Sequence, residues 1–126
     1  MIIVKKSTSQ IQGNIMDIKS YFKFTSIKHE VVDGDIDRYI YTATNIQIVE
    51  YHFPPNKKFP EHKHDDIEQI GYLVSGKMGF RIGGEEKVIV PGEYYHAPIG
   101  VLHSAWTMDE ASVLIDIFSP PREDLK

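Results

Sequence analysis

The stretch that decides the fold is HKHDDIEQIGYLVSG, residues 62–76. Side chains on an extended strand alternate between its two faces, so His62 and His64 are expected to project to the same side and to reach one metal ion together. Gln69 follows five residues after His64, with Glu68 beside it, and leads into an apolar, partly β-branched run. Two imidazoles and a candidate oxygen ligand therefore lie close together in the sequence.

A second stretch, GEYYHAPIGVLH at residues 92–103, supplies a further candidate ligand. Pro98 and Gly100 predict a turn shortly before His103. This histidine is therefore expected to reach the site from a different strand than the first pair.

The two stretches resemble the paired motifs of the cupin superfamily. The pattern H-x-H-x4-[E/Q]-x6-G fits the first stretch, and G-x5-P-x-G-x2-H fits the second, with matches at His62, His64, Gln69, Gly76, Gly92, Pro98, Gly100 and His103. The sequence departs from the family at Thr107, where asparagine is common. The resemblance implies an all-β fold, the double-stranded β-helix or jelly-roll β-barrel of the cupins, over roughly residues 38–122, with metal ligands at His62, His64, Gln69 and His103.

A bound divalent metal is expected only because both motifs are present. An isolated His-x-His pair is more often structural or on the surface, and a cupin that has kept its fold without the metal is the alternative. Gln69 is preferred to Glu68 because only Gln69 leaves six residues before Gly76. Neutral imidazole and amide ligands leave the charge of the ion uncompensated, so the site should favour an anionic ligand such as a carboxylate. The expected cofactor is one ion of Ni, Zn, Fe or Mn, because these ligands do not select among them.

Composition limits the remaining possibilities. The chain has 126 residues, no cysteine and a formal net charge of −4, so we expect one domain without disulfides or thiolate ligands. A nucleic-acid partner would need a basic face, and none is visible. No stretch approaches the roughly 20 apolar residues of a membrane span, and residues 1–10 lack the apolar centre of a signal peptide. A cytoplasmic protein with no nucleic-acid or membrane partner is expected.

Short segments rich in β-branched and aromatic residues, separated by turn residues, predict an antiparallel sandwich or barrel. Besides the motif strand they cover residues 38–44, 45–53, 77–82, 86–90 and 112–118. Gly83-Gly84 predicts a two-residue hairpin turn, and Pro60 is expected to stop regular pairing just before His62. Pro120-Pro121 is expected to end the last strand, with the charged tail leaving for solvent.

Residues 1–28 are predicted to be an N-terminal extension of a cupin domain at residues 29–126. Four apolar residues are spaced as on one helical face, but Gly13-Asn14 interrupts them: Ile11, Ile15, Ile18 and Phe22. A short helix and a strand exchanged with a partner subunit are both open. Small cupins commonly pair through sheet edges, so a homodimer is expected by analogy.

The C-terminal stretch IDIFSPPRED, residues 115–124, carries the remaining candidates. Alternation puts Asp116 and Phe118 on one face, and an acid facing inward in a strand needs a partner or a function. A structural ion pair between Asp116 and Arg122 is the alternative to a functional role. Together with residues 62–76, this ending resembles a narrower group of small cupins, the pectin-degradation proteins that linearise 4,5-unsaturated uronates. That resemblance implies that Asp116, Phe118 and Arg122 line the same cavity as the metal.

The implied reaction is metal-assisted opening of an unsaturated uronate, a small carboxylate, to an open-chain keto acid. In this hypothesis Arg122 clamps the carboxylate, Asp116 moves a proton and Phe118 packs on the sugar ring. Three histidines and one oxygen ligand also describe oxygen-activating cupins, so a dioxygenase is an alternative, as are a lyase acting on another small carboxylate and a non-catalytic sugar-acid binding protein. Oxygen consumption would separate the first of these from ring opening.

Overall fold

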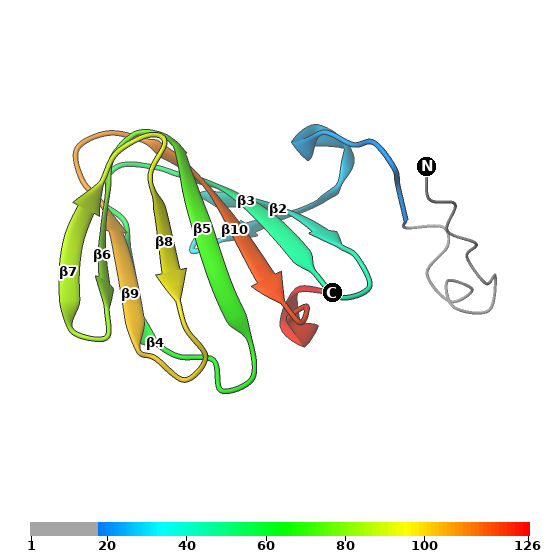
Figure 1. Cartoon of the computed structure of the whole chain (residues 1–126). Coiled ribbons are helices and arrows are strands. Elements are labelled where there is room, and N and C mark those ends of the chain that lie inside the picture. Colours follow the sequence, from blue (N-terminus) through cyan, green and yellow to red (C-terminus); the bar gives the residue numbers. More distant parts are fainter. Residues whose placement is uncertain (1–17) are drawn as a thin grey trace.

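The computed structural model of the protein describes residues 18–126. Most of the predicted N-terminal extension, with its proposed helix or exchanged strand, lies outside the described residues. Within them the regular structure consists of β-strands and two single-turn 3₁₀ helices, η1 (Phe24–Ser26) and η2 (Glu123–Leu125). The strands form two antiparallel sheets (Figure 1). The all-β jelly roll predicted from the motifs is confirmed.

The larger sheet has the strand order β1-β2-β3-β10-β5-β8 and the smaller one β4-β9-β6-β7. The six strands of the larger sheet are β1 (Lys28–Val32), β2 (Ile36–Thr42), β3 (Gln47–Phe53), β10 (Ser112–Ser119), β5 (Glu68–Ser75) and β8 (Tyr94–Ala97). The four strands of the smaller sheet are β4 (Lys58–His62), β9 (His103–Thr107), β6 (Met78–Ile82) and β7 (Glu85–Ile89). Neighbouring strands in each sheet are often distant in sequence, so the order of the strands decides which side chains meet.

The predicted hairpin between β6 and β7 is confirmed. Ile82 pairs with Glu85, which leaves Gly83 and Gly84 as the two turn residues. Both have positive φ, 57° and 87°. This is the conformation that a two-residue turn between twisted strands requires and that glycine adopts without steric cost.

Pro60 interrupts the pairing of β4, as predicted, but it does not end the strand. The register between β4 and β9 shifts between Phe59 and His62, and pairing resumes at His62 opposite His103. Proline has no N–H to donate, so the ladder is irregular where it occurs. The resumed pairing places two of the predicted metal ligands side by side.

The core lies between the two sheets and follows the alternation of the strands. In β3 every second residue is buried, and the same alternation in β10 turns Leu114, Asp116 and Phe118 inward. Phe118 and Leu73 have no exposed surface. Burying an apolar side chain of this size stabilises a fold by about 1.5–3 kcal/mol, so these rows hold the sheets together.

The C-terminal tail returns to the protein, and the prediction that it leaves for solvent was wrong. Leu125 of η2 is completely buried. The buried side chain of Gln47 donates a hydrogen bond to the carbonyl of Arg122 at 3.3 Å and accepts one from its N–H at 3.1 Å. Burial of Leu125 and the two hydrogen bonds to Gln47 together offset part of the entropy cost of ordering this short segment.

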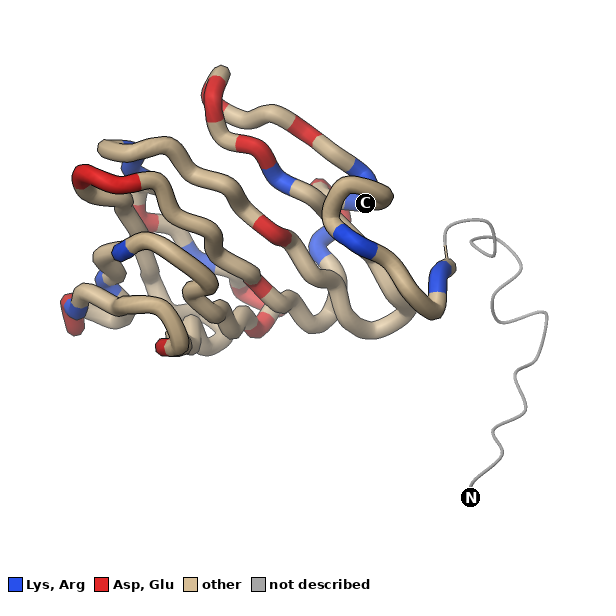
Figure 2. Tube along the Cα trace, turned by 90° about the horizontal axis from the view of Figure 1, so that it is seen from above, with Lys and Arg blue, Asp and Glu red and all other residues tan. Residues whose placement is uncertain are grey.

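The described part of the N-terminal extension contacts β2. The ring of Phe22 stacks on that of Tyr41 with 4.0 Å between centroids, and the Tyr41 hydroxyl donates to the carbonyl of Lys19 at 3.0 Å. Among residues 18–126 no helix is long and apolar enough to cross a membrane. Acidic and basic residues are interspersed along the described chain (Figure 2).

Candidate metal centre

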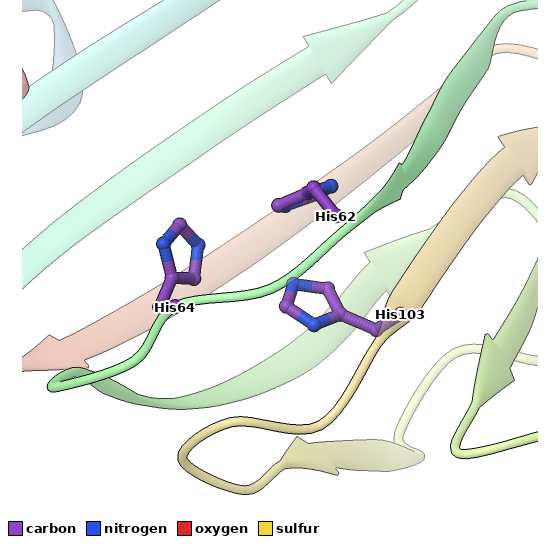
Figure 3. A group of neighbouring side chains, drawn as sticks. All are labelled: His62, His64 and His103. Atoms are coloured by element: carbon purple, nitrogen blue, oxygen red, sulfur yellow. The ribbon is translucent and has the colours of Figure 1, made fainter.

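Three histidines from two separate stretches meet between the sheets (Figure 3). His62 is the last residue of β4 and His103 the first of β9, whereas His64 lies in the loop that leads to β5. Their ligand nitrogens all lie within 4.8 Å of one another. The prediction that these three histidines lie close together is confirmed. His64 is placed by the conformation of the loop after β4, and not by strand alternation as predicted.

Hydrogen bonds orient two of the three rings. Nδ1 of His62 lies 2.9 Å from the carbonyl oxygen of Pro60, and Nδ1 of His103 lies 3.1 Å from that of Val101. A carbonyl only accepts, so each Nδ1 carries the proton and each Nε2 keeps its lone pair. The Nε2 atoms of His64 and His103 are buried and have no hydrogen-bond partner. Both are available to a metal ion.

The surroundings of His64 and His103 lower the pKa of both side chains. Burial, followed by the positive charge of Arg122 and the neighbouring imidazoles, lowers the pKa of His64 to about 4. Burial also lowers the pKa of His103. A metal ion binds the neutral form of imidazole. Surroundings that lower the pKa of these two histidines favour that neutral form, and therefore favour metal binding.

Gln69 and Glu68 lie on opposite faces of β5. Glu68 points outward, where its carboxylate lies 2.7 Å from Nε2 of His96. Gln69 is 6% exposed, and its Nε2 donates to Tyr95 Oη at 2.6 Å and to Asp116 Oδ2 at 3.3 Å. The other end of the amide, Oε1, is buried without a partner. A neutral oxygen and imidazole nitrogens form a donor set that fits a divalent ion.

The predicted site residues come together around one cavity of about 290 Å³. Six of the seven line it: His62, Gln69, His103, Asp116, Phe118 and Arg122. His64 joins the group through its contacts with the other two histidines. This volume lies at the lower end of the range for small-molecule sites, which begins at about 300 Å³, and is large enough for a monosaccharide.

Asp116 does not form the ion pair with Arg122 that was the structural alternative. Its Oδ1 accepts a hydrogen bond from the hydroxyl of Tyr95 at 2.5 Å, and its Oδ2 accepts from Gln69. Burial raises the pKa of Asp116 to about 7, although these hydrogen bonds and the charge of Arg122 oppose the shift. A carboxyl group facing a cavity without a fixed counter-ion remains as a candidate for proton transfer.

Arg122 is held at the edge of the cavity by the returning tail. Its Nε and Nη2 donate to the two carboxylate oxygens of Asp124 at 3.1 and 2.7 Å. Its guanidinium carbon lies 5.1 Å from the centre of the Phe118 ring, within the range of a cation–π interaction. The pairing with Asp124 leaves Nη1 and one N–H of Nη2 free to bind another anion.

Four polar residues of the cavity were not predicted from the sequence: Arg38, Tyr51, Tyr95 and Ser104. Arg38 lies between the buried residues Ile36 and Ile40 on the inner face of β2, and its Nε and Nη2 lie 2.8 and 2.7 Å from Oε1 of Glu30. An arginine alternating with two isoleucines was the signal available in the sequence. Burial raises the pKa of Tyr51 to about 12, so its hydroxyl stays protonated.

Thr107, where cupins often have asparagine, serves the backbone. Its Oγ1 donates to the carbonyl of Pro54 and accepts from the N–H of Lys57, both at 2.8 Å. These bonds tie the loop before β4 to β9. They stabilise the pair of strands that carries His62 and His103.

Comparison with known proteins agrees with this geometry. The family model described as Cupin domain matches residues 49–118. The pectin degradation protein KdgF of Dickeya dadantii (strain 3937) is 35% identical over 95 residues, which are 75% of this chain and 86% of that protein. The structure of KdgF from Halomonas sp. superposes with a TM-score of 0.80 at 29% identity, covering 86% of this chain and 100% of that one. An RmlC-like cupin from Shewanella frigidimarina NCIMB 400 gives a TM-score of 0.79 at 25% identity, covering 86% and 97%. The chain therefore belongs to the cupin superfamily, and within it to the small cupins that include the pectin degradation protein KdgF.

Proposed function

We propose that the protein is a metal-dependent enzyme that opens the ring of 4,5-unsaturated uronates during the breakdown of pectin or alginate. The observation that carries the proposal is a set of buried ligand atoms without partners beside a cavity lined by two arginines and one acid. The unpartnered atoms are Nε2 of His64, Nε2 of His103 and Oε1 of Gln69. The similarity to a pectin degradation protein supports the choice of substrate.

The residues that would hold the metal are His62, His64, Gln69 and His103. Every one of these ligands is neutral, so the ion would keep its full charge and the cavity would attract an anion. When bound, a divalent ion supplies Lewis-acid stabilisation of negative charge that develops on oxygen. Ni, Zn, Fe and Mn all suit this role, because ring opening needs no change of oxidation state.

The two arginines supply the charge that a carboxylate substrate needs. Arg122 has free N–H groups beside the cavity, and Arg38 reaches it from β2 with its guanidinium fixed by Glu30. Their side chains are only 18% and 20% exposed, so water screens them less than surface arginines. Paired hydrogen bonds from a guanidinium fix the orientation of a carboxylate as well as binding it.

The ring opening itself is an isomerisation. The anomeric hydroxyl loses its proton and becomes an aldehyde, the bond between the anomeric carbon and the ring oxygen breaks, and the alkene carbon gains a proton as the ring oxygen becomes a keto oxygen. Asp116 carries the only carboxyl among the described residues lining the cavity, so we assign it the transfer of these protons. Phe118 forms an apolar wall and supports Arg122.

The test follows the ultraviolet absorbance of an unsaturated uronate monomer prepared with a lyase. Metal-loaded protein should accelerate loss of the alkene signal above the spontaneous rate, and a chelator or His103→Ala should abolish the acceleration. His96→Ala is the matched control, because His96 lies on the outer face of β8 and should leave the rate unchanged. A rate equal to the spontaneous one in fully metal-loaded protein would refute ring opening.

The alternatives predict different results in the same preparation. A dioxygenase consumes oxygen with its substrate, a lyase on another carboxylate leaves the uronate intact, and a binding protein binds the uronate without turnover. The expected homodimer is tested separately by light scattering, where the molar mass of one chain would contradict it.

A further inference from the structure

One row of three residues crosses the last three strands of the larger sheet, β10, β5 and the edge strand β8, beside the metal centre. Gly71 of β5 pairs with Tyr95 of β8 on one side and with Asp116 of β10 on the other. A Cβ atom at Gly71 would lie 1.9 Å from Cε1 of Tyr95 and 2.6 Å from Oδ1 of Asp116. No other residue type fits, because the phenol ring occupies the space above the glycine and reaches across to Asp116.

When Asp116 is ionised, the hydrogen bonds along this row run in one direction only. The hydroxyl of Tyr95 donates its proton to Asp116 at 2.5 Å, so its oxygen is left to accept from Nε2 of Gln69 at 2.6 Å. Nε2 of Gln69 is also 3.3 Å from the second carboxylate oxygen of Asp116. If the amide turned over, its carbonyl oxygen would face that carboxylate and two acceptors would oppose each other.

The direction of these bonds decides where the amide oxygen points. With its nitrogen held by Tyr95 and Asp116, Gln69 turns Oε1 away from the row, and this atom is buried without a partner. Phe80 stacks on Tyr95 with 4.3 Å between centroids and keeps the phenol in place. An amide that was free to rotate would present nitrogen to the metal for part of the time.

We infer that Tyr95 is a positioning residue for the metal centre, which orients the amide of Gln69 so that its oxygen faces the three histidines, and that Gly71 provides the space for it. This inference rests on the proposed metal site. It assigns roles to two residues outside the metal ligands and the cavity triad of Asp116, Phe118 and Arg122.

The test compares metal affinity, measured by calorimetry with Mn²⁺ or Zn²⁺, between the whole protein and its Tyr95→Phe variant. Loss of a partner that orients a ligand typically weakens metal binding 10- to 100-fold, and we expect about this change. The visible spectrum of bound Co²⁺ should change as well, since an amide oxygen is lost or replaced. Tyr94→Phe is the matched control, because Tyr94 is the preceding residue, is 67% exposed and should leave both readouts unchanged.

A second background distinguishes orientation from a general loss of structure. In a Gln69→Ala protein there is no amide to orient, so adding Tyr95→Phe should change the remaining affinity less than about twofold. An equal loss in both backgrounds, or an unchanged affinity of Tyr95→Phe alone, would overturn the inference and leave the metal site standing. If the wild-type protein bound no metal at all, the proposed function would fail first.

Discussion

Arg122→Lys tests the substrate-binding part of the proposal most directly. Lysine keeps the positive charge but loses the planar fork that binds a carboxylate through two parallel hydrogen bonds. In the structure Asp124 takes Nε and one N–H of Nη2, which leaves donors for a second carboxylate on the other edge of the guanidinium. The substitution therefore removes paired bonding without removing the charge.

The expected magnitude follows from these contacts. A hydrogen bond to a charged group contributes about 1.5–3 kcal/mol, and losing one of the pair should lower kcat/KM about 10- to 150-fold. The effect on folding should be small. The contact with Asp124, whose side chain is 64% exposed, contributes at most about 1 kcal/mol, and lysine retains part of the interaction with Phe118. A decrease of only a few degrees in Tm is expected.

The assay measures initial rates of uronate loss at substrate concentrations well below KM, with the spontaneous rate subtracted. Arg81→Lys is the matched control, because Arg81 is exposed on β6 and belongs to the other, open groove of the smaller sheet. A kcat/KM within twofold of wild type for Arg122→Lys would show that Arg122 does not bind the carboxylate through paired bonds. An equal fall in both variants would point to a general effect of replacing arginine by lysine, and not to paired bonds made by Arg122.

Three further predictions concern the proton carrier, the metal and the arginine of β2. Asp116→Asn should lower kcat about 100-fold or more at saturating substrate, and an unchanged kcat would exclude Asp116 from proton transfer. Removing metal with a chelator should lower the Tm, because an ion at 100 times its dissociation constant stabilises the folded state by about 2.7 kcal/mol, and an unchanged Tm would contradict a metal in the core. Burial of Glu30 opposes ionisation, but the hydrogen bonds and charge of Arg38 outweigh it and lower the pKa of Glu30 from 4.5. As pH falls, the carboxyl of Glu30 takes up a proton in the unfolded state before it does so in the folded state. The stability that ionised Glu30 contributes is therefore present above pH 4.5 and is lost below it. Glu30→Gln should show a shallower decline of stability with falling pH in acid unfolding curves than wild type.

The amino-acid sequence alone determined the fold family and the identity of the main side chains of the site. His62, His64 and His103 could be assigned because motif spacing and local turn residues such as Pro98 and Gly100 are properties of short segments. Strand alternation likewise placed Asp116 and Phe118 on one face, and the Gly-Gly turn predicted its hairpin. Each of these features depends on residues within about ten positions of one another, where period and turn chemistry are informative.

The tertiary structure decided how these side chains are connected. Local sequence left open an ion pair between Asp116 and Arg122, yet Asp116 accepts a hydrogen bond from Tyr95, 21 residues away. Arg38 enters the cavity, and Leu125 brings the tail and Arg122 back to it. These contacts follow from the strand order β1-β2-β3-β10-β5-β8, which makes β5 the neighbour of both β8 and β10. No local pattern encodes that order, because it is set by burying one continuous core between two sheets.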